Sequence, residues 1–331
     1  FFAYISFFPQ LVAGPIERAT HLLPQFLRPR NFDCDLALDG IRQMLWGFFK
    51  KVVVADNCAL FVNGVFENYQ TLDGSTLFRG GFLLYDTDLR CIFPVYSDIA
   101  IGCARLFGID LMQNFKYPYF SRDIAEFWRR WHISLTTWFR DYIYIPLGGS
   151  RVGKWKSFRN TLVIFLVSGF WHGANWTFVA WGAYHALLFL PLLLLGQNRR
   201  YRDSVAENSF LPSVKELTQM GVTFLLVLLG WILFRSEDIS QAAVYLERMF
   251  NASLFSAPQL VGLGFGQLLL KKCFFFTALM FIVEWIGRKQ AHGLMIEDLS
   301  LPVRYVIYTV LLIIIYGFDA SNPQGFIYFQ F

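Results

Sequence analysis

The stretch from Thr161 to Leu195, TLVIFLVSGFWHGANWTFVAWGAYHALLFLPLLLL, is the most apolar part of the chain. A helix that spans a membrane needs about 20 largely apolar residues, so this stretch is too long for one span. Gly169, Gly173 and Asn175 interrupt it. The sequence therefore predicts two helical pieces that meet at a break within a membrane.

The composition of the whole chain agrees with a membrane protein. Of its 331 residues, 55% are hydrophobic and 16% are charged, and the mean hydropathy is +0.42. Soluble globular proteins average about 25% charged residues, so this chain lacks the charge to cover a soluble body. The same counts exclude disordered, collagen-like, coiled-coil and small disulfide-bonded proteins. We therefore expect an all-α polytopic membrane protein.

The net charge of +5 is modest and is spread along the chain. Basic clusters lie at the ends of many apolar segments. We interpret them as charge that flanks a membrane, which implies contact with membrane lipid and not with nucleic acid.

Other apolar segments add candidate spans along the chain. The clear ones are Val214–Phe234, Cys273–Ile286 and Val303–Phe318, and the weaker ones are Asp39–Phe66 and Leu77–Leu106. Ser240–Phe250 alternates polar and apolar residues at helical spacing, which is typical of an interfacial helix.

We expect residues 1–331 to form a single transmembrane domain. The chain begins Phe1-Phe2-Ala3, within an apolar run and with neither Met nor the basic start of a signal peptide. We therefore expect a fragment that lacks an N-terminal part. The five cysteines form no C-x-x-C pair, which favours buried apolar cysteines over a zinc site or a disulfide framework.

The densest polar stretch is DIAEFWRRWHISLTTWFRDYIYIPLGGSR, from Asp123 to Arg151. Its pattern predicts one helix from about Asp123 to Tyr142, with Ser121 as the cap and Asp123 near the positive end of the helix dipole. Arg129, His132 and Thr136 then share one face. Such a face lines a water-filled cavity or binds a polar ligand; the alternative is an interfacial helix with Trp anchors and snorkelling Arg.

His172 lies within the long apolar stretch and is flanked by small residues. A histidine at membrane depth is costly unless it is used or well paired. A neutral imidazole can take a hydroxyl proton near pH 7, as acyl transfer to an alcohol requires. The residues leave two interpretations open, a catalytic histidine and a hydrogen-bonded packing histidine.

The other histidines give weaker signals. His185 has aromatic and aliphatic neighbours in the sequence, which favours packing, and His21 and His292 lie in polar connections. Because carboxylates at ligand spacing are missing around these histidines, we expect no metal site.

Several segments resemble the membrane-bound O-acyltransferase (MBOAT) family and its bacterial alginate O-acetylase branch. The resembling segments, in chain order, are FFPQLVAGPIER (Phe7–Arg18), PQF (Pro24–Phe26), YSDIAIG (Tyr96–Gly102), NFKYPYFSRDIAEFWRRWHISLTTWFRDYIYIPLGGSR (Asn114–Arg151), SGFWHGANWTFVAWGAYHA (Ser168–Ala186) and the C-terminal FIYFQF. The combination of Trp-Arg-Arg-Trp-His with Trp-His-Gly is highly specific.

The resemblance implies a ring of transmembrane and partly inserted helices around a central tunnel. The family's invariant histidine corresponds to His172, and a second one, on the cytoplasmic side, corresponds to His132. Both are expected to be catalytic. Arg129 and Arg130 suit the phosphates of an anionic donor, and Trp171 and Asn175 are expected to shape the pocket.

The resemblance also implies the reaction. Members of this branch take acetyl groups from acetyl-CoA in the cytoplasm and pass them across the bacterial inner membrane to an exopolysaccharide such as alginate. A periplasmic acyltransferase partner is usual. The acyl donor is a substrate, and no bound cofactor is expected. Acetylation of peptidoglycan or another wall polymer is the alternative. A transporter is the alternative of another class; it would show inverted repeats, and we find no repeat.

The sequence departs from the family at Cys91–Val95. The family reads Asp-Phe-Ser-Gly before Tyr-Ser-Asp, whereas this chain reads CIFPV before an intact Tyr96-Ser97-Asp98. The family's Cys-Asp-Phe-Ser-Gly can be encoded as TGC GAT TTT TCC GGT. Deleting the G of GAT, with a T after the last codon, shifts the reading frame so that the same stretch encodes CIFPV. Asp86, Asp88 and Arg90 are also costly in a membrane-embedded segment, and Pro94 is expected to remove a helical hydrogen bond. We therefore interpret residues 86–95 as a reading-frame artefact or a damaged site, which resequencing of the gene would decide.

Overall fold

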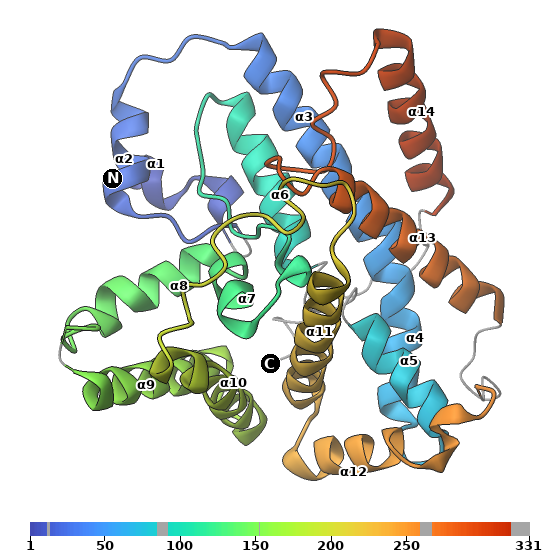
Figure 1. Ribbon diagram of the computed structural model, residues 1–331. Helices are drawn as coiled ribbons and strands as arrows, with labels where there is room; N and C mark the ends of the chain where they lie inside the picture. Colours follow the sequence, from blue (N-terminus) through green and yellow to red (C-terminus); the bar gives the residue numbers. More distant parts are fainter. Residues whose placement is uncertain (12–13, 85–91, 152, 259–266, 319–331) are drawn as a thin grey trace. The chain divides into compact units, whose positions relative to one another are not determined.

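The computed structural model describes residues 1–11, 14–84, 92–151, 153–258 and 267–318. Within these ranges every regular element is a helix (Figure 1). The prediction of an all-α protein is therefore confirmed for the part of the chain that the structure describes. Residues 85–91 and the C-terminal FIYFQF lie outside the described residues, and so does most of the interpretation of residues 86–95.

The chain forms two compact units, each built from segments that are distant in the sequence. The first unit contains Phe1–Leu60, Asp86–Lys116 and Gly266–Gln330, and the second contains Phe61–Tyr85 and Tyr117–Phe265. The expectation of a single domain stays a prediction.

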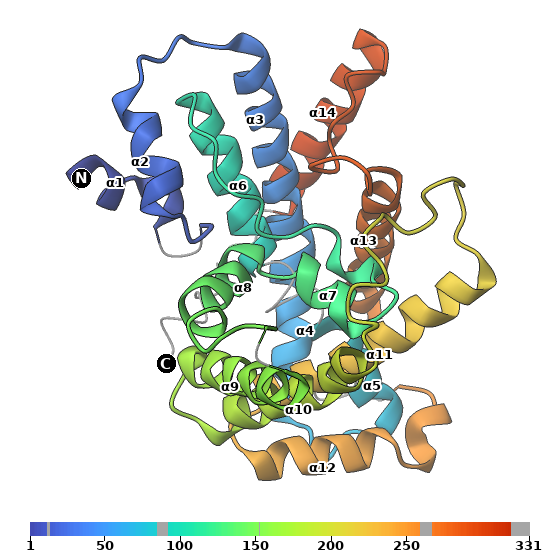
Figure 2. The same cartoon turned by 60° about the vertical axis from the view of Figure 1, so that its left-hand side comes forward.

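The first unit is built around the helix pair α3 and α6. Its helices are α1 (Phe2–Ile5), α2 (Ala19–Leu27), α3 (Cys34–Phe48), α6 (Ile92–Leu106), α13 (Gln267–Ile286) and α14 (Leu301–Gly317). Both views place α3 beside α6 (Figures 1 and 2). A Cβ on Gly40 of α3 would lie 2.5 Å from the carbonyl oxygen of Gly102 on α6, so small residues allow this close approach, as in many membrane proteins.

The predicted segment Asp39–Phe66 is one long helical run. It consists of α3, a π-helical part, η2 (Phe49–Ala55), and α4 (Asp56–Glu67). Lys50 in the π-helical part is buried and pairs with Asp98 of α6, whose other carboxylate oxygen accepts a 2.8 Å hydrogen bond from Gln43. An intramembrane charge is tolerated when it is paired in this way.

The helix α6 begins at Ile92, so Pro94 lies in its first turn. The first four N–H groups of any helix have no intrahelical partner. The residue four before Pro94, Arg90, lies outside the described residues, so the expectation that Pro94 removes a helical hydrogen bond stays a prediction.

The second unit holds the two apolar pieces predicted at the start. Its helices are α5 (Gly74–Leu84), α7 (Ile124–Arg130), α8 (Ile133–Phe139), α9 (Lys154–His172), α10 (Trp176–Leu194), α11 (Val214–Arg235) and α12 (Ile239–Met249). The helices α9 and α10 lie side by side in both views (Figures 1 and 2). A Cβ on Gly169 would overlap the carbonyl oxygen of Phe178, and a Cβ on Gly182 would overlap that of Phe165. Glycines on both helices therefore set this close approach.

The break predicted between these two pieces is confirmed. The helix α9 ends at His172 and α10 starts at Trp176, with the side chain of Asn175 accepting the N–H of Thr177 as an N-cap. The first piece starts at Lys154, seven residues before the predicted Thr161. Within the described residues, α10 and α11 are the two helices long and apolar enough to cross a membrane. The interfacial segment Ser240–Phe250 is helical as predicted, as α12.

Candidate active site

The polar stretch after Ser121 forms two short helices, so the predicted single helix is wrong. The chain leaves the helical conformation at Trp131 and His132, and His132 has a left-handed backbone with φ of 43°. Trp131 is buried, and its ring lies 5.0 Å from that of Trp231 on α11. This tertiary packing overrides the local helical pattern. Arg129, His132 and Thr136 therefore do not share one continuous helix face.

Asp123, and not Ser121, caps the first of these helices. The Asp123 carboxylate accepts the N–H of Glu126 at 2.7 Å. The Ser121 hydroxyl instead donates to the carbonyl of Pro118 at 2.5 Å. Ser121 was therefore the wrong cap, whereas Asp123 lies at the positive end of the helix dipole as predicted.

His132 lies at the junction between α7 and α8 and is 6% exposed. Burial lowers the pKa of its imidazole to about 4, so the ring is neutral at pH 7. A left-handed backbone at a residue other than glycine costs about 1–3 kcal/mol and is characteristic of functional sites.

His172 is the last residue of α9, at the break between the two apolar helices. Its half-buried ring makes edge contacts with the rings of Trp171, Trp181 and Phe234, with centroids 5.0, 5.4 and 5.0 Å away. The imidazole is close enough to His132 for a charge on one ring to act on the other. The second unit thus brings together the two histidines that the sequence singled out.

Trp171 and Asn175 lie on either side of the break. Trp171 is 50% exposed and lies edge-on against His172. The Asn175 amide caps α10 through its oxygen and donates from Nδ2 to the carbonyl of Glu237 at 2.6 Å. Asn175 therefore fixes the backbone of the break that positions His172.

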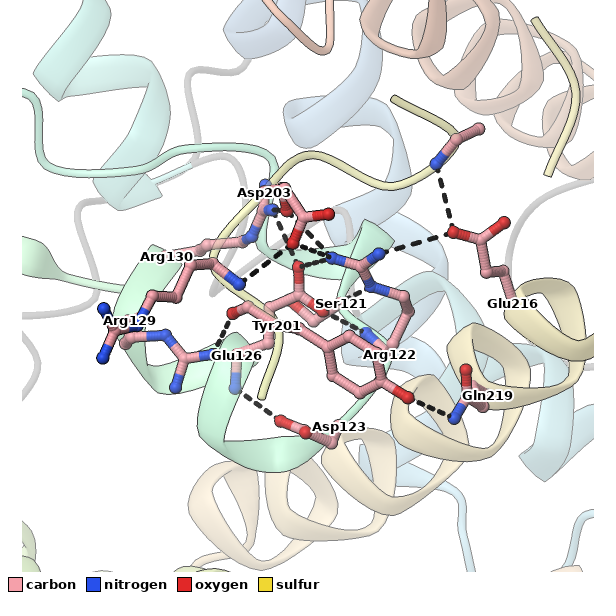
Figure 3. Close-up of polar contacts among 12 residues, drawn as sticks. Ser121, Arg122, Asp123, Glu126, Arg129, Arg130, Tyr201, Asp203, Glu216 and Gln219 are labelled. Atoms are coloured by element: carbon pink, nitrogen blue, oxygen red, sulfur yellow. Dashed lines mark hydrogen bonds and ion pairs between the residues drawn. The ribbon is translucent and has the colours of Figure 1, made fainter. Parts of the chain in front are cut away.

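The two arginines of the Trp-Arg-Arg-Trp motif contact the loop after α10. Arg130 is buried, pairs with Glu126 at 2.7 Å and donates to the carbonyl of Asp203 at 2.9 Å (Figure 3). Arg129 is exposed and donates to the carbonyls of Asn198 and Tyr201. Both side chains thus have protein partners in this structure, and their role toward a donor stays a prediction.

Sequence reasoning missed Arg122, which lies at the centre of this network. Its guanidinium makes two contacts of 3.1 Å with the Glu126 carboxylate and lies 4.4 Å from the ring centroid of Tyr201 (Figure 3). Burial would lower the pKa of Arg122, but its bonds to Glu126 and the charges of Asp203 and Glu216 outweigh burial and raise it. The i, i+4 spacing of Arg122 and Glu126 was the available signal.

The remaining histidines are structural in their surroundings. His185 is fully buried among aromatic rings, as the packing interpretation predicted. In the first unit His292 bonds Asp39 at 2.9 Å, and His21 bonds Glu17 at 2.8 Å from within α2, so the expectation that His21 lies in a connection is wrong. Among the described residues, no three His, Cys, Asp or Glu side chains gather as metal ligands.

Comparison with known proteins identifies the family. The model of the membrane-bound O-acyltransferase family matches residues 1–206, which include His132 and His172. The chain belongs to the membrane-bound O-acyltransferase (MBOAT) family. It is accordingly a membrane protein, and the resemblance drawn from its motifs is confirmed.

Curated relatives of this MBOAT chain include enzymes that acetylate polymers. "Probable alginate O-acetylase AlgI" of Pseudomonas aeruginosa is 38% identical over 275 residues, which are 82% of this chain and 50% of that protein. AlgI of Pseudomonas fluorescens is 39% identical over 78% of this chain and 50% of that protein. "Peptidoglycan O-acetyltransferase" of Helicobacter pylori is 38% identical over 74% of this chain and 45% of that protein. The chain thus spans about half the length of these relatives.

Proposed function

We propose that this chain carries the acyl-transfer centre of an O-acetyltransferase, a multi-pass protein of the bacterial inner membrane. It takes acetyl groups from acetyl-CoA on the cytoplasmic side and passes them across the membrane for O-acetylation of an exopolysaccharide such as alginate. The observation that supports this proposal is the placement of His132 and His172 at two helix breaks of one unit, with His132 near enough for its charge to act on His172. We also propose that residues 1–331 are part of a single MBOAT-type transmembrane domain.

His172 acts as the base or as an acyl relay. As a base, its imidazole takes the proton of the acceptor hydroxyl while the hydroxyl oxygen attacks the thioester carbonyl carbon. The carbon–sulfur bond then breaks, and the leaving thiolate takes up the proton. As a relay, a ring nitrogen of the imidazole attacks the thioester carbonyl carbon and the carbon–sulfur bond breaks, which releases the thiol. The acceptor hydroxyl then attacks the same carbon, the carbon–nitrogen bond breaks, and the imidazole takes up the hydroxyl proton. The rings of Trp181 and Phe234 cover part of the His172 imidazole and so limit the access of water, which would compete with the acceptor.

His132 orients the donor or accepts from it. Because its imidazole is neutral, it can accept or donate a hydrogen bond without the cost of a buried charge. Arg129 is the exposed arginine of the motif and is suited to a donor phosphate, since its present partners are uncharged carbonyls. Arg130 supports this site through Glu126. Trp171 is exposed beside His172 and lines the approach to it.

A second protein is part of the proposal. We infer that a periplasmic acyltransferase receives the acetyl group and places it on the polysaccharide acceptor. The longest polar connection of the second unit, from residue 197 to residue 213, is pinned to α7 and α11. It is a connection and provides no further catalytic domain.

The runner-up is acetylation of peptidoglycan or another wall polymer. The relative from Helicobacter pylori supports it, because its identity of 38% equals that of the alginate relative. Membership of an acyltransferase family favours both over a transporter.

The direct test uses the full-length protein in proteoliposomes with labelled acetyl-CoA outside. Alginate and peptidoglycan fragments are supplied inside, each with and without the periplasmic fraction of the same organism. We expect labelled alginate only when that fraction is present. Labelling of peptidoglycan alone would favour the runner-up, and efficient labelling without the fraction would contradict the need for a partner.

A further inference from the structure

The helices α7, α10 and α11 meet around a single imidazole. His185 of α10 contacts Trp128 of α7 and Trp181 of α10, with ring centroids 5.0 and 5.1 Å away. Trp231 of α11 lies 6.0 Å from it. We call these four side chains the His185 ring cluster. All of them belong to the second unit.

The polar atoms of the His185 ring cluster have no protein partner. His185 is 0% exposed. Across the described residues, neither of its ring nitrogens makes a hydrogen bond, and the same is true of the indole nitrogens of Trp128, Trp181 and Trp231. A buried polar atom without a partner costs about 1–3 kcal/mol. Several such atoms on four neighbouring buried side chains suit a ligand that forms hydrogen bonds.

The chemistry of these atoms defines the ligand. An indole N–H is only a donor, and a neutral imidazole has one donor and one acceptor. The cluster therefore holds four donors and one acceptor. Nε2 of His185 lies against the backbone of Gly230, so Nδ1 and the three indole N–H groups are the atoms that can face a ligand. Its complement is an oxygen with free lone pairs, as in an acyl carbonyl or a carboxylate. The aromatic surroundings suit a short apolar substituent on that group.

Gly230 of α11 explains why His185 can lie here. A Cβ at residue 230 would be 2.6 Å from Nε2 of His185 and 3.3 Å from the ring of Tyr184. Only glycine lets the imidazole rest against α11 in this position. The backbone of α11 thus holds one edge of the His185 ring in place.

The ring cluster adjoins the catalytic histidine through a shared side chain. Trp181 contacts His172 with ring centroids 5.4 Å apart and His185 with ring centroids 5.1 Å apart, so one indole touches both imidazoles. Donors aimed at the carbonyl oxygen stabilise the negative charge that develops there.

We propose that the His185 ring cluster binds the carbonyl oxygen of the acyl group that is transferred, with His185 as the acyl-binding residue. This inference rests on the proposed function, since it names the site that holds the acyl part of the donor. It identifies the side chains that donate hydrogen bonds to the carbonyl oxygen during acyl transfer.

The test compares four forms of the full-length protein in detergent: wild type, His185→Phe, His185→Gln and Tyr184→Phe. Phenylalanine keeps a ring and removes both nitrogens, whereas glutamine keeps one donor and one acceptor. Tyr184→Phe is the matched control, because it removes a hydroxyl that bonds the carbonyl of Leu226 at 2.8 Å on the same helix pair. Calorimetric titration gives the dissociation constants of acetyl-CoA and of free CoA. A thermal melt gives the stabilisation by sodium acetate relative to sodium chloride.

We expect His185→Phe to lose affinity for acetyl-CoA selectively. His185→Phe should weaken acetyl-CoA binding by about tenfold, as for one lost hydrogen bond, and should leave CoA binding within twofold of wild type. His185→Gln should keep part of the difference in affinity between acetyl-CoA and CoA, and Tyr184→Phe should have the affinities of wild type. Sodium acetate should raise the melting temperature of wild type and not that of His185→Phe.

Three results would overturn the inference: equal weakening of acetyl-CoA and CoA in His185→Phe, no weakening of either, or the same acetate stabilisation in His185→Phe as in wild type. If wild type binds neither acetyl-CoA nor CoA, the proposed donor is wrong. The acetate melts then still decide whether the ring cluster binds a carbonyl or carboxylate oxygen.

Discussion

Arg122 and Glu126 form a two-point ion pair whose side chains are 5% and 1% exposed. The same Glu126 carboxylate also pairs with Arg130 and accepts the backbone N–H of Arg122 at 2.8 Å. One buried carboxylate therefore holds two guanidinium groups and the start of α7 next to the loop after α10.

Replacing this carboxylate should strongly destabilise the second unit. Glu126→Gln removes the carboxylate that two buried arginines share, which costs about 3–5 kcal/mol. Arg122 keeps its longer contacts with Asp203 at 3.7 Å and Glu216 at 3.4 Å. The exposed Glu247 on α12 is the matched control, and Glu247→Gln should change stability by less than about 0.5 kcal/mol. Thermal unfolding in detergent measures both, and equal melting temperatures would disprove the central role of Glu126.

The close approach of α9 and α10 should depend on glycine at residue 169. Gly169→Ala places a methyl group on the carbonyl oxygen of Phe178, and such overpacking costs about 1–3 kcal/mol. Gly221 of α11 has open space around its Cβ position, so Gly221→Ala should be neutral or raise stability by up to about 1 kcal/mol. We expect the melting temperature to fall in Gly169→Ala and to stay unchanged or rise in Gly221→Ala. A fall of similar size in both variants would argue against the close approach of α9 and α10.

Removing the imidazole at the break should abolish acetyl transfer. His172→Ala should reduce polymer acetylation by about 10²–10⁴-fold, the contribution of a positioned base, while the protein still accumulates in the membrane. His132→Ala should also be strongly impaired. His21→Ala, on the exposed side of α2, is the control and should retain activity. Wild-type acetylation by a well-expressed His172→Ala variant would end the catalytic assignment, and a loss confined to His132→Ala would reverse the two roles.

The buried His132 should make stability depend on pH. Its folded pKa of about 4 lies below the ordinary value of 6.5, so between these values the unfolded chain binds a proton that the folded chain does not. The stabilisation is therefore complete above pH 6.5 and is lost as the pH falls toward 4, by up to about 3 kcal/mol.

His132→Gln cannot titrate, so its melting temperature should fall less steeply over that pH range. The difference between the two profiles therefore reports His132 together with its effect on the neighbouring His172. Parallel pH profiles would show that His132 is not buried as described.

The sequence predicted those features of the second unit that depend on local residues. Gly173 and Asn175 predict the break after α9, because a glycine and an N-cap residue both favour the end of one helix and the start of another. The left-handed turn at His132 could not be predicted, since it follows from the packing of Trp131 on Trp231, a hundred residues along the chain. The partners of Arg130 could not be predicted for the same reason, because Asp203 is distant in the sequence and lies next to Arg130 only in the folded chain.

The arginines of α7 hold the following loop by its backbone. Arg129 and Arg130 donate to the carbonyl oxygens of Asn198, Tyr201 and Asp203, and every amino acid supplies such an oxygen. The bonds from Arg129 and Arg130 therefore depend on the length of the loop and not on the side chains of these residues. The side chains of Tyr201 and Asp203 contact Arg122 in addition, whereas, within the described part of the chain, that of Asn198 has no such role toward the arginines. Homologues should vary at residue 198 yet conserve the number of residues in the loop, and a one-residue deletion should harm the protein more than a substitution of Asn198.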